Sequence, residues 1–148
     1  MSHSTLAWRH LAAASTISLL AACAQTPVVA SNPAPRAAAT WYHVDFGTSS
    51  HVIDATGEQT IAGVTNFLQL NPHAVATIIG KTDTVGSVDY NMHLSHQRAD
   101  AVRDALVYHS NVAAERIETR WIGQNRQDVA TAGDVPAKEN RVVDITIQ

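Results

Sequence analysis

The chain has 148 residues, of which 45% are hydrophobic and 16% charged, and its formal net charge at pH 7 is −3. This length and apolar content suffice for one domain with a core and are unlike those of a coiled coil or a disordered charged tail. Only 10 Lys+Arg face 13 Asp+Glu, with no basic run, so nucleic-acid binding through phosphate contacts is not expected. A single cysteine excludes an intrachain disulfide framework and a multi-cysteine zinc site.

Residues 1–22 have the pattern of a secretory signal peptide. Arg9 precedes an apolar run over 11–22, which at about 12 residues is too short to span a bilayer. The run ends in Leu20-Ala21-Ala22-Cys23, which resembles the bacterial lipobox, in which the cysteine is acylated with fatty acids such as palmitate and becomes the mature N-terminus. The alternative is an ordinary signal peptide with an incidental cysteine. Acylation would anchor the chain without a transmembrane helix, and Ala24 resembles sorting signals for the outer membrane.

Residues 23–40 are predicted to be a lipidated N-terminus followed by an Ala/Pro-rich linker. Three prolines, Pro27, Pro33 and Pro35, interrupt a segment without apolar periodicity. Extended geometry at about 3.1 Å per residue would give the linker a reach of roughly 50 Å. The folded domain is therefore expected over 41–148, held away from a membrane surface.

The rest of the chain alternates between strand and helix patterns. Strands are predicted over 41–46, 75–80, 117–122 and 141–148, and helices over 57–70 and 88–109. In the first helix the apolar residues Ile61, Val64 and Leu68 have helical spacing, and the last strand alternates cleanly. Right-handed crossovers then place both helices on one face of a small mixed sheet, giving a two-layer α+β fold in the order β-α-β-α-β-β.

The loop after the second strand carries the most informative side chains. Gly80-Lys81-Thr82 is not a P-loop, because position 75 is valine where that motif needs glycine. Arg98 follows Leu94 by one helical turn and therefore points from the helix toward the sheet, where a guanidinium must be paired or border a cleft. Asp83 and Arg98 are thus predicted to face each other across a cleft at the carboxyl edge of the sheet. A purely structural Asp83–Arg98 salt bridge is the alternative.

These residues belong to a longer motif, Gly80-Lys81-Thr82-Asp83-x-x-Gly86-Ser87-x-x-Tyr90-Asn91-x-x-Leu94-Ser95-x-x-Arg98. It resembles the central signature of the OmpA-like (OmpA C-terminal) peptidoglycan-binding domain. Val44-Asp45-Phe46 and Asn140-Arg141 support the resemblance, which covers about residues 42–147. It implies a β-α-β-α-β-β fold and non-covalent binding of the peptidoglycan stem peptide, centred on meso-diaminopimelate.

The resemblance also implies a role for each site residue. Asp83 would take the ammonium of the diaminopimelate centre and Arg98 its carboxylate. Thr82 and Asn91 would add hydrogen bonds, and Arg141, on the helix-facing side of the last strand, would reach the cleft. The chain departs from the family pattern at Lys81 (usually His), Gly47 (acidic in some members) and Val142 (usually a second arginine).

The predicted function is that of a binding module, not an enzyme: an outer-membrane lipoprotein whose periplasmic domain tethers the envelope to the cell wall. No cofactor is expected, and no nucleophile-elbow pattern is present. One alternative is a protein-interaction subunit of an envelope machine, of the Tol–Pal, secretion or stator type, with wall binding secondary. Another is a metal-binding protein using His93 and His96, which otherwise lie on a solvated helix face.

Overall fold

The computed structural model describes residues 39–148. Its strands are β1 (Thr40–Asp45), β2 (Ala76–Gly80), β3 (Ile117–Trp121) and β4 (Val142–Ile147), and its main helices are α1 (Ala55–Leu70) and α2 (Val88–Asp104). Short helical turns follow at η1 (Ala105–His109), η2 (Ala114–Arg116) and η3 (Lys138–Asn140). The predicted order of strands and helices is confirmed. The predicted signal peptide over 1–22, the lipidation at Cys23 and the linker up to residue 38 lie outside the described residues.

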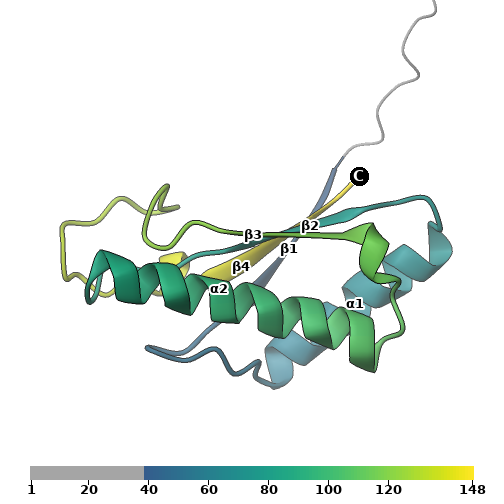
Figure 1. Ribbon diagram of the computed structural model, residues 1–148, viewed down its shortest axis with the longest axis horizontal. Helices are drawn as coiled ribbons and strands as arrows, with labels where there is room; N and C mark the ends of the chain where they lie inside the picture. The colour runs from purple at the N-terminus through teal and green to yellow at the C-terminus, as the bar shows by residue number, and fades with distance from the viewer. Residues whose placement is uncertain (1–38) are drawn as a thin grey trace, which may run out of the picture. The chain divides into compact units, whose positions relative to one another are not determined.

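The four strands form one mixed sheet in the order β1-β4-β2-β3. β4 is antiparallel to both of its neighbours, whereas β2 and β3 are parallel and joined through α2. Both helices lie on the same side of the sheet, as Figure 1 shows. The two-layer α+β prediction is therefore confirmed, and none of the helices described within residues 39–148 lies on the opposite face of the sheet. None of the helices within residues 39–148 is long and apolar enough to cross a membrane.

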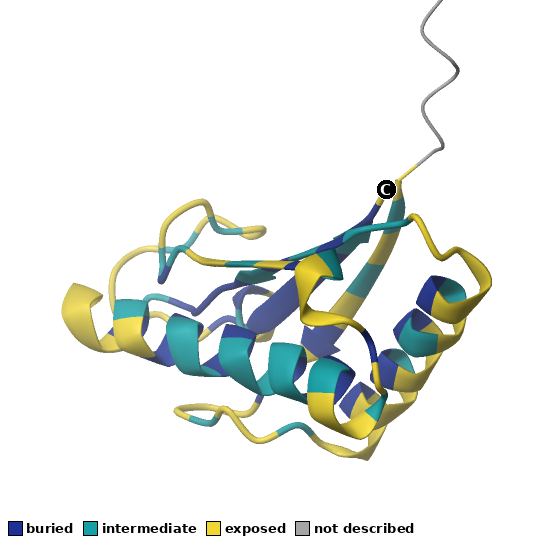
Figure 2. Ribbon diagram, turned by 45° about the vertical axis from the view of Figure 1, so that its right-hand side comes forward, coloured by how far each residue is buried: buried dark blue, intermediate teal, exposed yellow. Residues whose placement is uncertain are grey.

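The hydrophobic core lies between the sheet and the two helices. Ile145 on β4 and Ile78 on β2 are both fully buried, and they pack against Leu68 of α1 and Val102 of α2. Figure 2 shows the buried side of each helix turned toward the sheet and the exposed side turned outward. Burial of each such side chain contributes about 1.5–3 kcal/mol relative to exposure, so this face of the sheet is fixed toward the helices.

The helix starts are set by capping residues. Asp54 accepts a hydrogen bond from the Gly57 backbone N–H at 2.8 Å, so α1 begins two residues before the predicted position. Ser87 caps α2 in the same way through the Tyr90 N–H at 3.2 Å. The second helix reaches His109 as predicted, but its last five residues form a π-helical turn.

Gly80, the last residue of β2, allows α2 to approach the sheet closely. A Cβ atom there would lie 2.0 Å from the Ser95 carbonyl oxygen, which is less than any real contact distance. Because Ser95 and Arg98 share a face of α2, this approach brings Arg98 beneath the segment that follows β2. The candidate site lies at this junction.

Candidate functional site

Arg98 is the most deeply buried charged residue of the site, with no exposed surface. Its Nε donates to the Ser50 carbonyl at 2.8 Å, Nη1 to the Lys81 carbonyl at 2.9 Å and Nη2 to the Gly47 carbonyl at 2.9 Å. Its Cζ lies 5.3 Å from the centre of the Phe46 ring. Arg98 therefore ties the segment after β1 to the end of β2, and it does so through neutral carbonyl groups.

The charge of Arg98 is retained at neutral pH. The pKa of its guanidinium is lowered to about 10, chiefly by burial; the positive charge of Arg141 acts in the same direction, and the negative charge of Asp83 opposes both. A pKa near that value still leaves the group protonated at pH 7. The site thus holds a full positive charge away from water.

Asp83 is nearly buried, with 5% of its surface exposed. Its Oδ2 accepts hydrogen bonds from Arg141 Nη1 at 3.1 Å and from the Ala137 N–H at 3.3 Å. Among the salt bridges of residues 39–148, Asp83 pairs with Arg141 and not with Arg98. The alternative of a direct Asp83–Arg98 salt bridge is therefore wrong, although the two side chains lie close enough for their charges to interact.

Thr82 and Asn91 flank this pair in different ways. Asn91 Nδ2 donates to the Val85 carbonyl at 3.1 Å and to Gln124 Oε1 at 2.7 Å, so its amide holds two loops together. The Thr82 hydroxyl is buried and has no hydrogen-bond partner within residues 39–148. A buried hydroxyl without a partner costs about 1–3 kcal/mol, so Thr82 has hydrogen-bonding capacity that a ligand or water would satisfy.

The irregular segment 123–140 forms one wall of the site. Its contact with Asp83 is not predicted from the sequence. Gln124 and Ala137 provide the contacts to Asn91 and Asp83 described above. Asp134 accepts from the Gly86 N–H at 3.1 Å, and Asn140 bonds to both backbone groups of Val129. No periodicity marks these residues, and only Asn140 belongs to the motif that the family resemblance uses.

The site is closed in this conformation. Arg98 has no exposed surface, and the Arg141 side chain, which is 15% exposed, occupies the Asp83 carboxylate. A ligand held between Asp83 and Arg98 therefore requires Arg141 to leave the carboxylate and the segment around Gly47 and Ser50 to move.

The three positions that depart from the family pattern have different surroundings. Gly47 contributes the carbonyl that accepts from Arg98. Lys81 points to the opposite face of the sheet from Asp83, where its Nζ lies 2.6 Å from Asp128 and 2.5 Å from Asp144. Val142 is also buried. The amino group of Lys81 is thus engaged away from the Asp83–Arg98 site.

Of the two histidines on α2, His96 makes local contacts. His96 Nε2 lies 3.2 Å from Asp100, and its ring stacks on Trp121 with the ring centres 3.9 Å apart. No group of three or more His, Cys, Asp or Glu side chains gathers in a metal-binding arrangement between residues 39 and 148.

Comparison with known proteins gives consistent matches. Residues 45–141 match the model of the OmpA family. The chain is 36% identical over 105 residues to probable lipoprotein YiaD of Escherichia coli K12, covering 71% of this chain and 48% of that protein. It is 32% identical over 96 residues to the peptidoglycan-associated lipoprotein of Brucella melitensis, covering 65% of this chain and 56% of that protein.

Solved structures show the same architecture. The peptidoglycan-associated lipoprotein from Burkholderia pseudomallei superimposes with a TM-score of 0.66 at 25% identity, covering 72% of this chain and 89% of that one. The chain spans about half of the length of the two curated lipoproteins named above.

Proposed function

Since the chain belongs to the OmpA family, we propose that its domain binds peptidoglycan non-covalently through the meso-diaminopimelate of the stem peptide. That residue carries an ammonium and a carboxylate on one carbon. Asp83 would accept the ammonium, and Arg98 would hold the carboxylate through its planar fork. The proposal concerns binding alone, with no chemical step.

One observation carries the proposal: the buried positive charge of Arg98 faces only neutral carbonyl groups in its direct hydrogen bonds. Its three partners are backbone oxygens, while Asp83, the carboxylate whose charge acts on Arg98, is paired with Arg141. A buried charge without a directly paired counter-ion is costly. A ligand carboxylate would supply that counter-ion, because two of the five guanidinium N–H groups remain after the three hydrogen bonds.

Binding would proceed by exchange of partners. The incoming ammonium would replace the Arg141 guanidinium on Asp83, so one charge-assisted hydrogen bond is lost as another forms. The released Arg141 would then face the ligand carboxylate together with Arg98. The unpartnered Thr82 hydroxyl and the Asn91 amide, which already fixes the loop from Gln124, complete the polar lining.

At the level of the whole protein, we propose a lipid-anchored tether between the outer membrane and the cell wall. Two of the relatives are lipoproteins by name, and one of them is named as peptidoglycan-associated. Acylation of Cys23 and a linker over 23–40 would place the domain in the periplasm within reach of the wall. Mass spectrometry of the mature N-terminus tests the anchor, and an N-terminus without lipid on Cys23 contradicts it.

Co-sedimentation with purified sacculi tests the binding site. Asp83→Asn removes the negative charge with little change of shape, and we expect at least a tenfold loss of affinity for sacculi and for a diaminopimelate-containing muropeptide. Asp89→Asn, on the exposed first turn of α2, is the matched control and should bind like the wild type. If Asp83→Asn is folded by circular dichroism and still sediments like the wild type, the site assignment is wrong.

A further inference from the structure

A second candidate site, which is concave, lies on the face of the sheet that carries none of the helices described in residues 39–148. It is a pocket of about 500 Å³ whose walls come from all four strands and from the turn over 126–128. The strand register places His43, Asp144, Ile79 and Arg120 in one row across the sheet. Their neighbours Ile78 and Ile145 belong to the core, so this row faces away from the helices. The pocket is therefore separate from the Asp83–Arg98 site.

The floor of the pocket is a group of paired charges, with one ammonium between two carboxylates. The Lys81 ammonium bridges Asp128 and Asp144, and Asp144 also contacts His43 Nδ1 at 3.0 Å. Lys81 and Asp144 are buried, whereas the Asp128 side chain is 46% exposed. The floor thus offers both an ammonium and carboxylate oxygens, a combination that matches hydroxyl groups, which donate and accept together.

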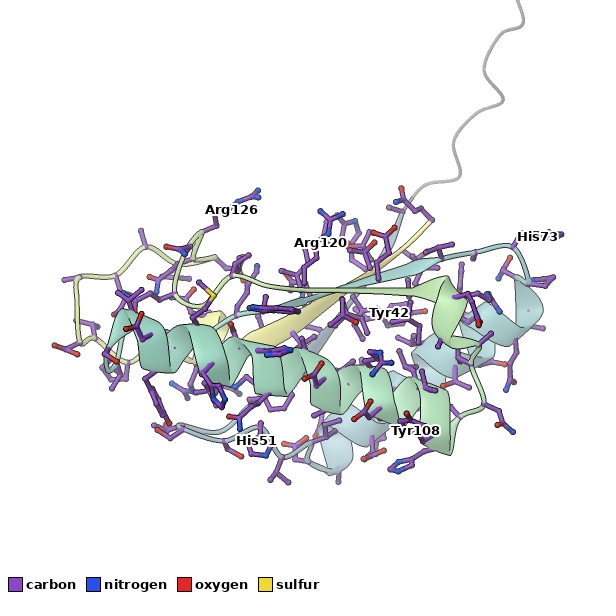
Figure 3. The ribbon with its side chains drawn as sticks, in the orientation of Figure 1. Tyr42, His51, His73, Tyr108, Arg120 and Arg126 are labelled. Atoms are coloured by element: carbon purple, nitrogen blue, oxygen red, sulfur yellow. The ribbon has the colours of Figure 1, made fainter. Side chains whose placement is uncertain are left out.

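The rim carries two arginines with little internal pairing. The Arg120 side chain is 67% exposed, and its contact is a 3.4 Å approach to the exposed Glu118. Arg126 makes no hydrogen bond or salt bridge with another residue of the described part of the chain. Figure 3 shows both arginines projecting from the side of the sheet away from α2. Two guanidinium groups over one pocket favour an anionic ligand group, and a planar carboxylate fits their geometry.

Trp41 provides the apolar wall. It lies on the edge strand β1, lines the pocket and leaves 62% of its surface exposed. The negatively polarised face of an indole attracts the weakly positive C–H hydrogens of a ring that lies against it. A simple anion would gain nothing from this surface, and a lipid chain would gain nothing from the charged floor.

We propose that this pocket binds an acidic saccharide, a sugar ring that bears a carboxylate. The ring would lie on Trp41, its hydroxyls would meet Lys81 and Asp128, and its carboxylate would meet Arg120 and Arg126. The pocket volume lies within the range of about 300–1,000 Å³ that small-ligand sites occupy. This inference concerns a different site from the Asp83–Arg98 site proposed for the stem peptide (the stem-peptide site). It rests on the proposed function in one respect only, the identity of the polymer that supplies the ligand. That source is the wall glycan, whose muramic acid has a free lactyl carboxylate wherever the peptide has been removed.

Calorimetric titration of the full-length chain with the disaccharide N-acetylglucosaminyl-N-acetylmuramic acid tests the inference. We expect the double variant Arg120→Gln with Arg126→Gln to weaken binding at least tenfold and Trp41→Ala at least fivefold. Asp83→Asn, the variant that tests the stem-peptide site, should bind the disaccharide like the wild type. Di-N-acetylchitobiose, which has similar rings and no carboxylate, should bind at least tenfold more weakly.

Four results would overturn the inference: no binding of the disaccharide at millimolar concentration, equal binding of di-N-acetylchitobiose, equal binding of lactate alone, or loss of binding in Asp83→Asn with retention in the double arginine variant. The third would mean that the arginines hold an adventitious ion only. The fourth would place the disaccharide in the stem-peptide site. The first three results leave muropeptide binding by Asp83 untouched, and the fourth would support a binding role for Asp83. Failure of this proposal is therefore distinguishable from failure of the proposed function, which the sacculus assay with Asp83→Asn tests separately.

Discussion

The two sides of the sheet use arginine in opposite ways. On the helix side, Arg98 has no exposed surface and donates to three backbone carbonyls. On the other side, Arg120 is 67% exposed and touches one exposed carboxylate at 3.4 Å. Both sides meet at the end of β2. There the Lys81 carbonyl accepts from Arg98, while the Lys81 side chain enters the floor of the pocket lined by Trp41 and Arg120 on the other face of the sheet. We call these the open pocket and the open face.

This difference shows that arginine can be required for the folded structure on one face of the sheet and be dispensable for folding on the other. Removal of Arg98 would leave carbonyl groups of three loop positions without their donor, so a loss of binding in such a variant does not by itself identify a ligand contact. Removal of Arg120 leaves few partners behind. Comparison of the two faces therefore separates an effect on folding from an effect on binding.

The largest expected effect is at Arg98. Lys retains the positive charge but cannot donate to three carbonyls in a fixed plane, so Arg98→Lys should lower the free energy of unfolding by about 4 kcal/mol. Arg120→Lys is the control on the open face, and it should change stability by less than about 0.5 kcal/mol. Urea unfolding followed by circular dichroism measures both. Equal stabilities of the two variants would show that burial does not distinguish the two faces.

A substitution at Gly80 tests the close packing of α2 on β2, which concerns only the helix side of the sheet. A methyl group there would meet the Ser95 carbonyl oxygen at 2.0 Å and Ala99 Cβ at 3.2 Å, and α2 would have to move away from β2. Gly80→Ala should therefore destabilise the domain by about 3 kcal/mol. A Cβ atom at Gly133 would have no neighbour within 4 Å, so Gly133→Ala is the matched control, expected to be within about 0.5 kcal/mol of the wild type. A Gly80→Ala variant as stable as the control would contradict the observed approach of α2 to the sheet.

The fold could be predicted because local patterns and global packing agree. The spacing of Ile61, Val64 and Leu68 marks the buried side of α1, and the alternation through Val143 and Ile145 marks the buried side of β4. Helix ends were less accurate, since the Asp54 cap lies outside the apolar pattern that defined the helix. The π-helical turn at the end of the second helix could not be predicted, because the spacing of apolar residues there does not distinguish it from an α-helix.

The site was only partly predictable. The motif brought Asp83, Arg98, Thr82, Asn91 and Arg141 to one end of the sheet, and the structure places them there. It did not reveal that Asp83 pairs with Arg141, because the motif gives positions and not side-chain directions. Gln124 and Ala137 were missed because their contacts join irregular segments far apart in the chain. The open pocket could not be predicted either, because the residues that line it come from four strands and a turn and do not form one sequence motif.

The smallest expected effect is a pH dependence on the open face. Burial alone would lower the pKa of the Lys81 ammonium, but the hydrogen bonds and negative charges of Asp128 and Asp144 raise it above the usual 10.5. A group whose pKa is raised on folding stabilises the folded state fully below its unfolded pKa, and this contribution is lost as the pH rises through the folded value. The loss should therefore begin near pH 10.5 and continue above it.

The variant Lys81→Met isolates this contribution from the other groups that titrate at high pH. At pH 7 it should be less stable than the wild type by about 2 kcal/mol, less than for a fully buried pair because Asp128 is half exposed. The stability difference between the two proteins should shrink as the pH rises beyond 10.5, because the wild-type lysine then loses its charge. Urea unfolding from pH 7 to pH 11.5 measures it, with Lys138→Met, at an exposed position, as the control. A difference that stays constant across this range would mean that Lys81 contributes to the pocket floor through packing and not through its charge.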